Sequence, residues 1–121
     1  MSKTIKVLCV GAGHMGTSHA RAYHAIEGFE ICGIVTRSEG SRRALNEDLG
    51  ASYPEFGDYY EALEATKPDA VSISTYPDTH AAYAKAAMEA GADVFIEKPL
   101  AETVAEAEEI VAKARETGRK L

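Results

Sequence analysis

The sequence lacks any apolar run long enough to span a bilayer. Its lysines and arginines form no cluster. Its 19 acidic residues outnumber 13 basic ones, and the formal net charge is −6. An acidic chain without a basic stripe has little electrostatic attraction to nucleic acids or to anionic membranes. We therefore expect neither a nucleic acid nor a membrane as a partner.

Cysteine is scarce too, with only Cys9 and Cys32. Both fall in segments that we predict to be strands, where one interpretation is a disulfide or a metal pair and the other is two small buried side chains. We favour buried thiols and predict no metal, because no Cys/His spacing resembles a zinc site. The first apolar segment begins at Ile5, so we expect no signal peptide and a cytoplasmic location.

The chain shows no repeats and no low-complexity linker, and 121 residues suit one domain with a single core. Strands are predicted at 5–10, 30–35, 70–74 and 93–96, with a short one near 51–53, and helices at 15–26, 39–49, 59–66, 79–90 and 104–117. The strands are nearly continuous apolar runs, which is typical of strands covered by helices on both faces. We predict an α/β fold, a doubly wound, Rossmann-like parallel sheet, as a single dinucleotide-binding domain over residues 1–121.

A glycine-rich turn stands between the first strand and the first helix. It reads Gly11-Ala12-Gly13-His14-Met15-Gly16. Gly11 permits a tight turn, Gly13 lets the backbone approach a pyrophosphate, and Gly16 lets the helix pack close to the strand. The helix N-terminus offers free N–H groups and a partial positive charge to phosphates. A tight turn without a ligand and a methyltransferase site are the alternatives, but the strand before and the helix after favour a dinucleotide.

The second strand lacks the acidic residue that NAD-binding folds usually place at its tip, about 20 residues past the glycines. Thr36, Arg37 and Ser38 stand there instead. An arginine can pair with a 2′-phosphate, and the two hydroxyls can donate to it, with Arg42 and Arg43 close by in the next helix. Arginine is also compatible with NAD, so the missing acid carries most of the inference. We predict NADP as the cofactor, with NAD as the alternative.

Two further segments leave strands at the edge where ligands of open α/β sheets bind. The segment after residues 70–74 contributes Ser74, Thr75, Tyr76, Pro77 and His80, and the segment after residues 93–96 contributes Glu97, Lys98 and Pro99. A lysine beside a nicotinamide can hydrogen-bond a substrate hydroxyl and assist its proton transfer. A charged turn stopped by proline is the alternative.

The four histidines have weaker interpretations. His14 lies in the glycine turn, exposed near the expected phosphates. His19 and His24, on the first helix, are interpreted as structural or surface residues. His80 falls in the first turn of a helix at the ligand edge, where positioning the cofactor and capping or packing are equally good interpretations.

The glycine turn, the Ser-Thr-x-Pro-Asp-Thr-His segment and the tripeptide Glu97-Lys98-Pro99 occur in this order, each after a strand. The combination resembles the N-terminal domain of the Gfo/Idh/MocA oxidoreductases (glucose–fructose oxidoreductase, inositol dehydrogenase and relatives) over almost the whole chain. The resemblance implies the following placement. The glycines hold the pyrophosphate of a nicotinamide dinucleotide, and the adenosine ribose is faced by Thr36 and Arg37. The residues that lie toward the nicotinamide are Ser74, Thr75, Pro77 and His80. Glu97 shapes the site, and Lys98 contacts substrate and nicotinamide. It also implies a cis Lys98–Pro99 bond, which is frequent in relatives.

The resemblance further implies the cofactor domain of an oxidoreductase that transfers a hydride between the nicotinamide and a sugar, polyol or similar hydroxyl or carbonyl compound. A non-catalytic NAD(P)-binding sensor is the alternative, and the intact Glu-Lys-Pro tripeptide counts against it. Two departures stand out: Tyr76 replaces a proline that is common in relatives, and the family's C-terminal substrate domain is absent. Residues 118–121 resemble the start of another strand. We therefore expect an inactive fragment that needs the missing domain to bind a small-molecule substrate, with a homo-oligomer left open.

Overall fold

The computed structural model describes residues 4–121 as one parallel sheet covered by helices. The strands are β1 (Ile5–Val10), β2 (Phe29–Val35), β3 (Glu55–Phe56), β4 (Ala70–Ile73) and β5 (Asp93–Ile96), and the helices are α1 (His14–Ala25), α2 (Glu39–Leu49), α3 (Tyr59–Thr66), α4 (Pro77–Glu89) and α5 (Val104–Thr117). Every strand pairing is parallel, and the strand order is β3-β2-β1-β4-β5. The predicted doubly wound sheet is confirmed.

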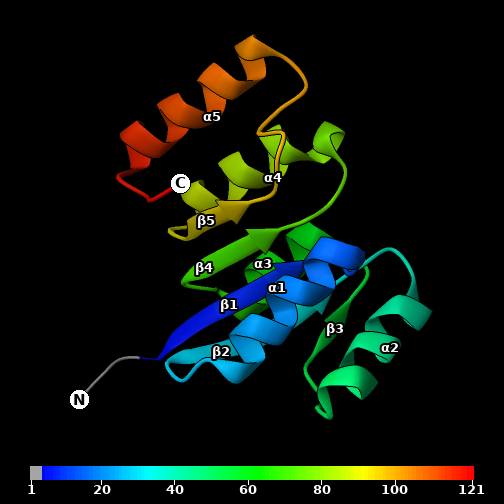
Figure 1. Ribbon diagram of the computed structural model, residues 1–121. Coiled ribbons are helices and arrows are strands. Elements are labelled where there is room, and N and C mark those ends of the chain that lie inside the picture. The colour runs from blue at the N-terminus through cyan, green and yellow to red at the C-terminus, as the bar shows by residue number, and fades with distance from the viewer. Residues whose placement is uncertain (1–3) are drawn as a thin grey trace.

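Alternate residues of the central strand serve the two faces of the sheet. Val7 and Cys9 pack against α1 and α2, whereas Leu8 and Val10 belong to a larger core with α3, α4 and α5. In Figure 1, α1 crosses one side of the sheet and α5 lies at the end of the molecule, beyond α4 and β5. Because successive side chains of a strand point to opposite faces, a strand buried on both faces is apolar throughout.

The short third strand lies later in the sequence than predicted, at Glu55–Phe56 instead of near 51–53. The side-chain amide of Asn46 explains the shift. Its Nδ2 donates to the carbonyl of Tyr53 (3.0 Å), and its Oδ1 accepts from the amide of Tyr53 (2.8 Å). These bonds use both backbone groups of Tyr53, so pairing with β2 begins at Pro54, whose carbonyl accepts from the Ile34 amide (2.9 Å).

The last residues run beside β5 without forming the expected strand. The amide of Val94 donates to the carbonyl of Lys120 (2.8 Å), and the amide of Lys120 donates to the Asp93 carboxylate (2.9 Å). The C-terminus accordingly lies next to β5 in Figure 1. The tail therefore lies where a sixth strand would lie, but among the described residues it makes only one backbone hydrogen bond to β5.

Cys9 is a free thiol on β1, 2% exposed, and burial raises its pKa to about 12. Only the thiolate reacts with alkylating reagents. We expect Cys9 to resist iodoacetamide at pH 8 in the folded protein and to react fully once guanidinium unfolds the chain, as read by mass spectrometry. Cys32, a free and less buried thiol, serves as the internal control. Faster labelling of Cys9 than of Cys32 would contradict this burial.

Two further observations concern the described residues, 4–121. None of their helices is long and apolar enough to cross a membrane. No group of three or more histidine, cysteine, aspartate or glutamate side chains in them is placed to hold a metal ion.

Candidate functional site

The turn between β1 and α1 is built from glycines that do different work. Gly11 has φ +97°, and a Cβ there would clash with the carbonyl of Ser74 in the loop after β4. A Cβ on Gly16 would clash with the carbonyl of Gly11. Gly13 precedes α1 as its N-cap, and a Cβ there would have no protein atom within 4 Å. The fold thus requires Gly11 and Gly16, whereas Gly13 leaves open space in front of the helix N-terminus.

A pocket of about 330 Å³ opens beside this turn, over the carboxyl ends of β1, β2 and β4. Eight residues that the sequence indicated as cofactor-binding line it: Gly11, Ala12, Gly13, Thr36, Arg37, Ser74, Thr75 and Tyr76. The strand order reverses between β1 and β4. The pocket therefore occupies the crevice where ligands of open α/β sheets bind.

Two tyrosines form a wall of the pocket that the sequence did not predict. Tyr59 and Tyr83 stack with ring centroids 4.1 Å apart, and the Tyr59 hydroxyl donates to the carbonyl of Tyr83 (2.8 Å). Burial raises the pKa of both phenols, and the Arg37 guanidinium opposes the rise at Tyr83. A positive charge therefore lies near an aromatic wall, an arrangement that suits the flat face of a purine.

The hydroxyls after β2 are partly engaged within their own turn. Thr36 Oγ1 donates to the carbonyl of Ser38 (2.6 Å), so its proton is committed. Ser38 Oγ accepts from the amide of Ser41 (3.3 Å) as the N-cap of α2. Ser38 therefore keeps a proton to donate.

The arginines near this turn differ in what they contact. Arg42 Nη1 donates to the carbonyl of Thr36 (2.7 Å), and Arg43 Nη2 pairs with Glu39 (2.6 Å). Arg37 lines the pocket, whereas these two do not. Arg42 therefore stabilises the turn through its bond to the Thr36 carbonyl. Of the three arginines, Arg37 is the one positioned for a ligand.

The loop after β4 carries a buried polar atom without a partner. Ser74 Oγ is shielded from solvent and has no hydrogen bond, although Ser74 lines the pocket. In contrast, the hydroxyls of Thr75 and Thr79 bond each other (2.6 Å). Since buried polar groups are nearly always satisfied, the Ser74 hydroxyl is suited to a ligand.

The Glu97-Lys98-Pro99 turn lies at the same edge, after β5, outside the pocket lining. The Glu97 amide donates to the carbonyl of Ile73 (2.9 Å), which fixes the start of the turn beside the end of β4. The Lys98–Pro99 bond is cis, as the resemblance implied, and Lys98 is exposed. The other predicted residues outside the lining are His14, Met15, Gly16, Ser38, Pro77 and His80.

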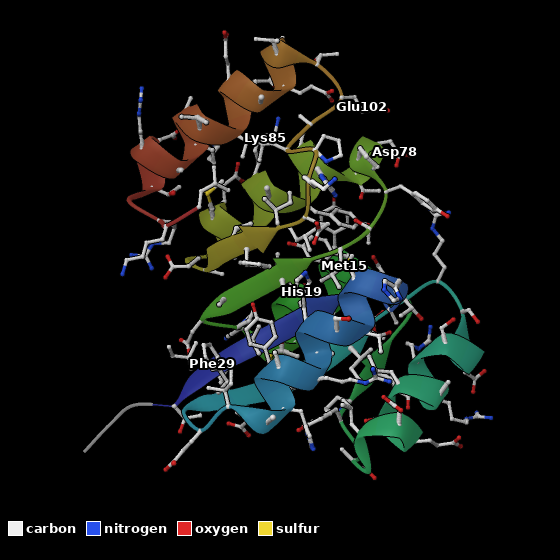
Figure 2. All side chains as sticks on the ribbon, viewed as in Figure 1. Met15, His19, Phe29, Asp78, Lys85 and Glu102 are labelled. Atoms are coloured by element: carbon white, nitrogen blue, oxygen red, sulfur yellow. The ribbon has the colours of Figure 1, made fainter. Side chains whose placement is uncertain are left out.

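Two histidines contact this turn. His19 Nε2 lies 2.9 Å from Glu97 Oε2, and this hydrogen bond is the main reason why the pKa of Glu97 is lowered. Figure 2 shows His19 on α1, with Met15 one turn earlier. His80 is fully buried, with Nδ1 2.8 Å from the Pro99 carbonyl. The sequence placed His80 at the ligand edge, but it gave no signal that His19 pairs with Glu97, since 78 positions separate them.

Comparison with known proteins places these features in a family context. The model of an oxidoreductase family with an NAD-binding Rossmann fold, GFO_IDH_MocA, matches residues 5–121. The chain is 35% identical over 114 residues to 4-carboxy-2-hydroxymuconate-6-semialdehyde dehydrogenase of Sphingobium sp., and 34% identical over 119 residues to inositol 2-dehydrogenase 1 of Saccharopolyspora erythraea. These alignments cover 94% and 98% of this chain but only 36% and 35% of those proteins.

A solved structure is also similar: scyllo-inositol dehydrogenase from Lactobacillus casei with bound cofactor NAD(H) and scyllo-inositol. It superposes with a TM-score of 0.89 at 25% identity, over 96% of this chain and 34% of that one. The present chain thus spans about a third of the length of the proteins that it matches.

Proposed function

The chain belongs to the Gfo/Idh/MocA oxidoreductase family, and on this basis we propose that it is the cofactor domain of a dehydrogenase that transfers a hydride between NADP and a sugar, polyol or similar small molecule. The observation that carries the proposal is the convergence of the glycine turn, the pocket and the Glu97-Lys98-Pro99 turn on one edge of the sheet. The substrate would be bound with the help of the further domain that members of this family carry.

The residues of the site fit a dinucleotide. The open space at Gly13, in front of the N-terminus of α1, suits a pyrophosphate, which needs close backbone approach. The unpartnered Ser74 hydroxyl, in a residue that lines the pocket, would supply a polar contact to the dinucleotide. Tyr83 and Arg37 suit the adenosine end, and Lys98, in the turn after β5, would lie toward the nicotinamide end.

The chain would contribute to the reaction mainly by binding and orienting. When bound, the nicotinamide supplies or accepts the hydride. The Lys98 ammonium would donate a hydrogen bond to the substrate oxygen and assist the proton transfer that accompanies oxidation or reduction at that carbon. Its exposure at the sheet edge leaves it accessible to a substrate held by another domain.

Arg37 supports NADP over NAD, because an arginine in the pocket can pair with a 2′-phosphate and no acid there would repel one. We expect Arg37→Asp in the full-length protein to weaken NADPH binding by about 10- to 100-fold, since it removes a charge-assisted hydrogen bond and adds a repulsive charge. NADH affinity should be unchanged or higher. Calorimetric titration with each dinucleotide measures both.

The matched control is Arg43→Asp, which makes the same charge change in an exposed pair outside the pocket. This variant should alter both affinities by less than about 3-fold. Equal affinity of the unaltered protein for NADPH and NADH would contradict the preference. Failure to bind either dinucleotide would contradict the proposed function itself.

A further inference from the structure

We propose that His19 and His80 are positioning residues that clamp the Glu97-Lys98-Pro99 turn from its two sides and thereby fix where Lys98 is presented. The inference rests on the function proposed above for the role of Lys98. Its structural part concerns contacts within the described chain and can be tested without a cofactor.

The first contact ties the turn to the glycine-rich end of the site. His19 Nε2 and Glu97 Oε2 are 2.9 Å apart, with both side chains about a quarter exposed or less. The His19 ring also meets Phe95 of β5 edge-on, with centroids 5.0 Å apart, which orients the imidazole toward the turn. His19 belongs to α1, the helix whose N-terminus follows the glycine turn. The pair therefore connects α1 to the residue directly before Lys98.

The second contact ties the turn to the loop that lines the pocket. His80 Nδ1 lies 2.8 Å from the carbonyl of Pro99, and Nε2 lies 3.1 Å from the carbonyl of Thr75. Both neighbours are acceptors, and a neutral imidazole carries one N–H, so the ring donates to one of the two carbonyls and lies against the other. The ring is fully buried in the first turn of α4. His80 therefore bridges the residue directly after Lys98 to the loop after β4.

The position of Lys98 depends on these contacts, because packing does not fix its side chain. Lys98 is exposed, so the backbone of the turn determines where its ammonium can reach. A misplacement of about 1 Å at a reacting group can cost about 100-fold in rate. Holding Glu97 by its carboxylate and Pro99 by its carbonyl restricts the tripeptide on both sides of the lysine.

The test compares loss and rescue of each donor in the full-length protein. His19→Leu and His80→Leu remove the donors. His19→Gln retains an amide N–H at the position of Nε2, and His80→Asn retains one at the position of Nδ1. The control is His24→Gln, because His24 lies on the same helix α1 but contacts the Tyr53 hydroxyl (2.6 Å), away from the turn.

Amide hydrogen exchange of the cofactor-free protein gives the first readout. We expect the two leucine variants to raise exchange about 10-fold or more at residues 97–101, without a matching rise in β1 or the C-terminal half of α4. The Gln and Asn variants should recover much of the protection, and His24→Gln should match the unaltered protein. Unchanged exchange at 97–101 in folded leucine variants would overturn the clamp. If His80→Leu does not fold, the His19 pair and His80→Asn decide.

Steady-state kinetics give the second readout. We expect the leucine variants to lower kcat about 10- to 100-fold while KM for the dinucleotide changes less than about 3-fold. A change confined to KM, or the same kcat in the leucine and rescue variants, would overturn the positioning role. Loss of dinucleotide binding by the unaltered protein would instead refute the proposed function, and the exchange result would still decide whether the clamp exists.

Discussion

Replacing Lys98 with methionine in the full-length protein is expected to lower kcat by about 100- to 10,000-fold, the range for removing a general acid or base. Methionine keeps much of the length of the side chain but has no proton to donate. Because Lys98 lies outside the lining of the pocket, the dissociation constant of NADPH should change by less than about 3-fold. Single-turnover kinetics and a separate titration measure the two effects.

Lys85→Met is the matched control for this experiment. Lys85 lies on α4 and pairs with Glu109 of α5 (3.2 Å), an exposed contact away from the sheet edge. Its loss should leave kcat unchanged within about 2-fold. If Lys98→Met retained full turnover, the lysine would have no part in the chemistry. If it abolished dinucleotide binding as well, Lys98 would instead be part of the binding site.

The sequence could predict those parts of the site in which the residue type itself indicates the local backbone conformation. The glycine turn is such a case. Gly16 is required by a contact with Gly11 in the same turn, and Gly11 by a contact with Ser74, which follows a strand that the sequence predicts. The apolar strands, buried on both faces, likewise predicted the parallel sheet and its covering helices. The lack of an acidic residue after β2 can likewise be seen in the sequence without knowing how the chain packs.

The parts that sequence missed depend on residues brought together from distant elements. Tyr59 and Tyr83 stack across α3 and α4, and His19 meets Glu97 across 78 positions, with no local pattern to signal either contact. The third strand was predicted too early for a different reason, a contact only seven positions apart in the sequence. The Asn46 side chain occupies the backbone of Tyr53, a competition that strand propensity does not contain.

Replacement by alanine should affect the stability of the fold very differently at Gly16 and at Gly13. A methyl group on Gly16 would meet the carbonyl of Gly11, a backbone atom that cannot turn away, so Gly16→Ala should lower the free energy of unfolding by about 3 kcal/mol. The gain in helix propensity, about 1 kcal/mol, is too small to offset a backbone clash. Chemical denaturation measures the loss.

Gly13→Ala should instead spare the fold, with a change in unfolding free energy below about 1 kcal/mol, because no protein atom lies within 4 Å of the added carbon. The methyl group would occupy the space where we place the pyrophosphate, so NADPH binding should weaken by about 10-fold or more. Unaltered binding by a folded Gly13→Ala variant would show that the phosphates do not approach this turn. Equal destabilisation by both substitutions would mean that Gly13 is needed for packing. It would contradict the assignment of Gly16 to the fold and Gly13 to dinucleotide binding.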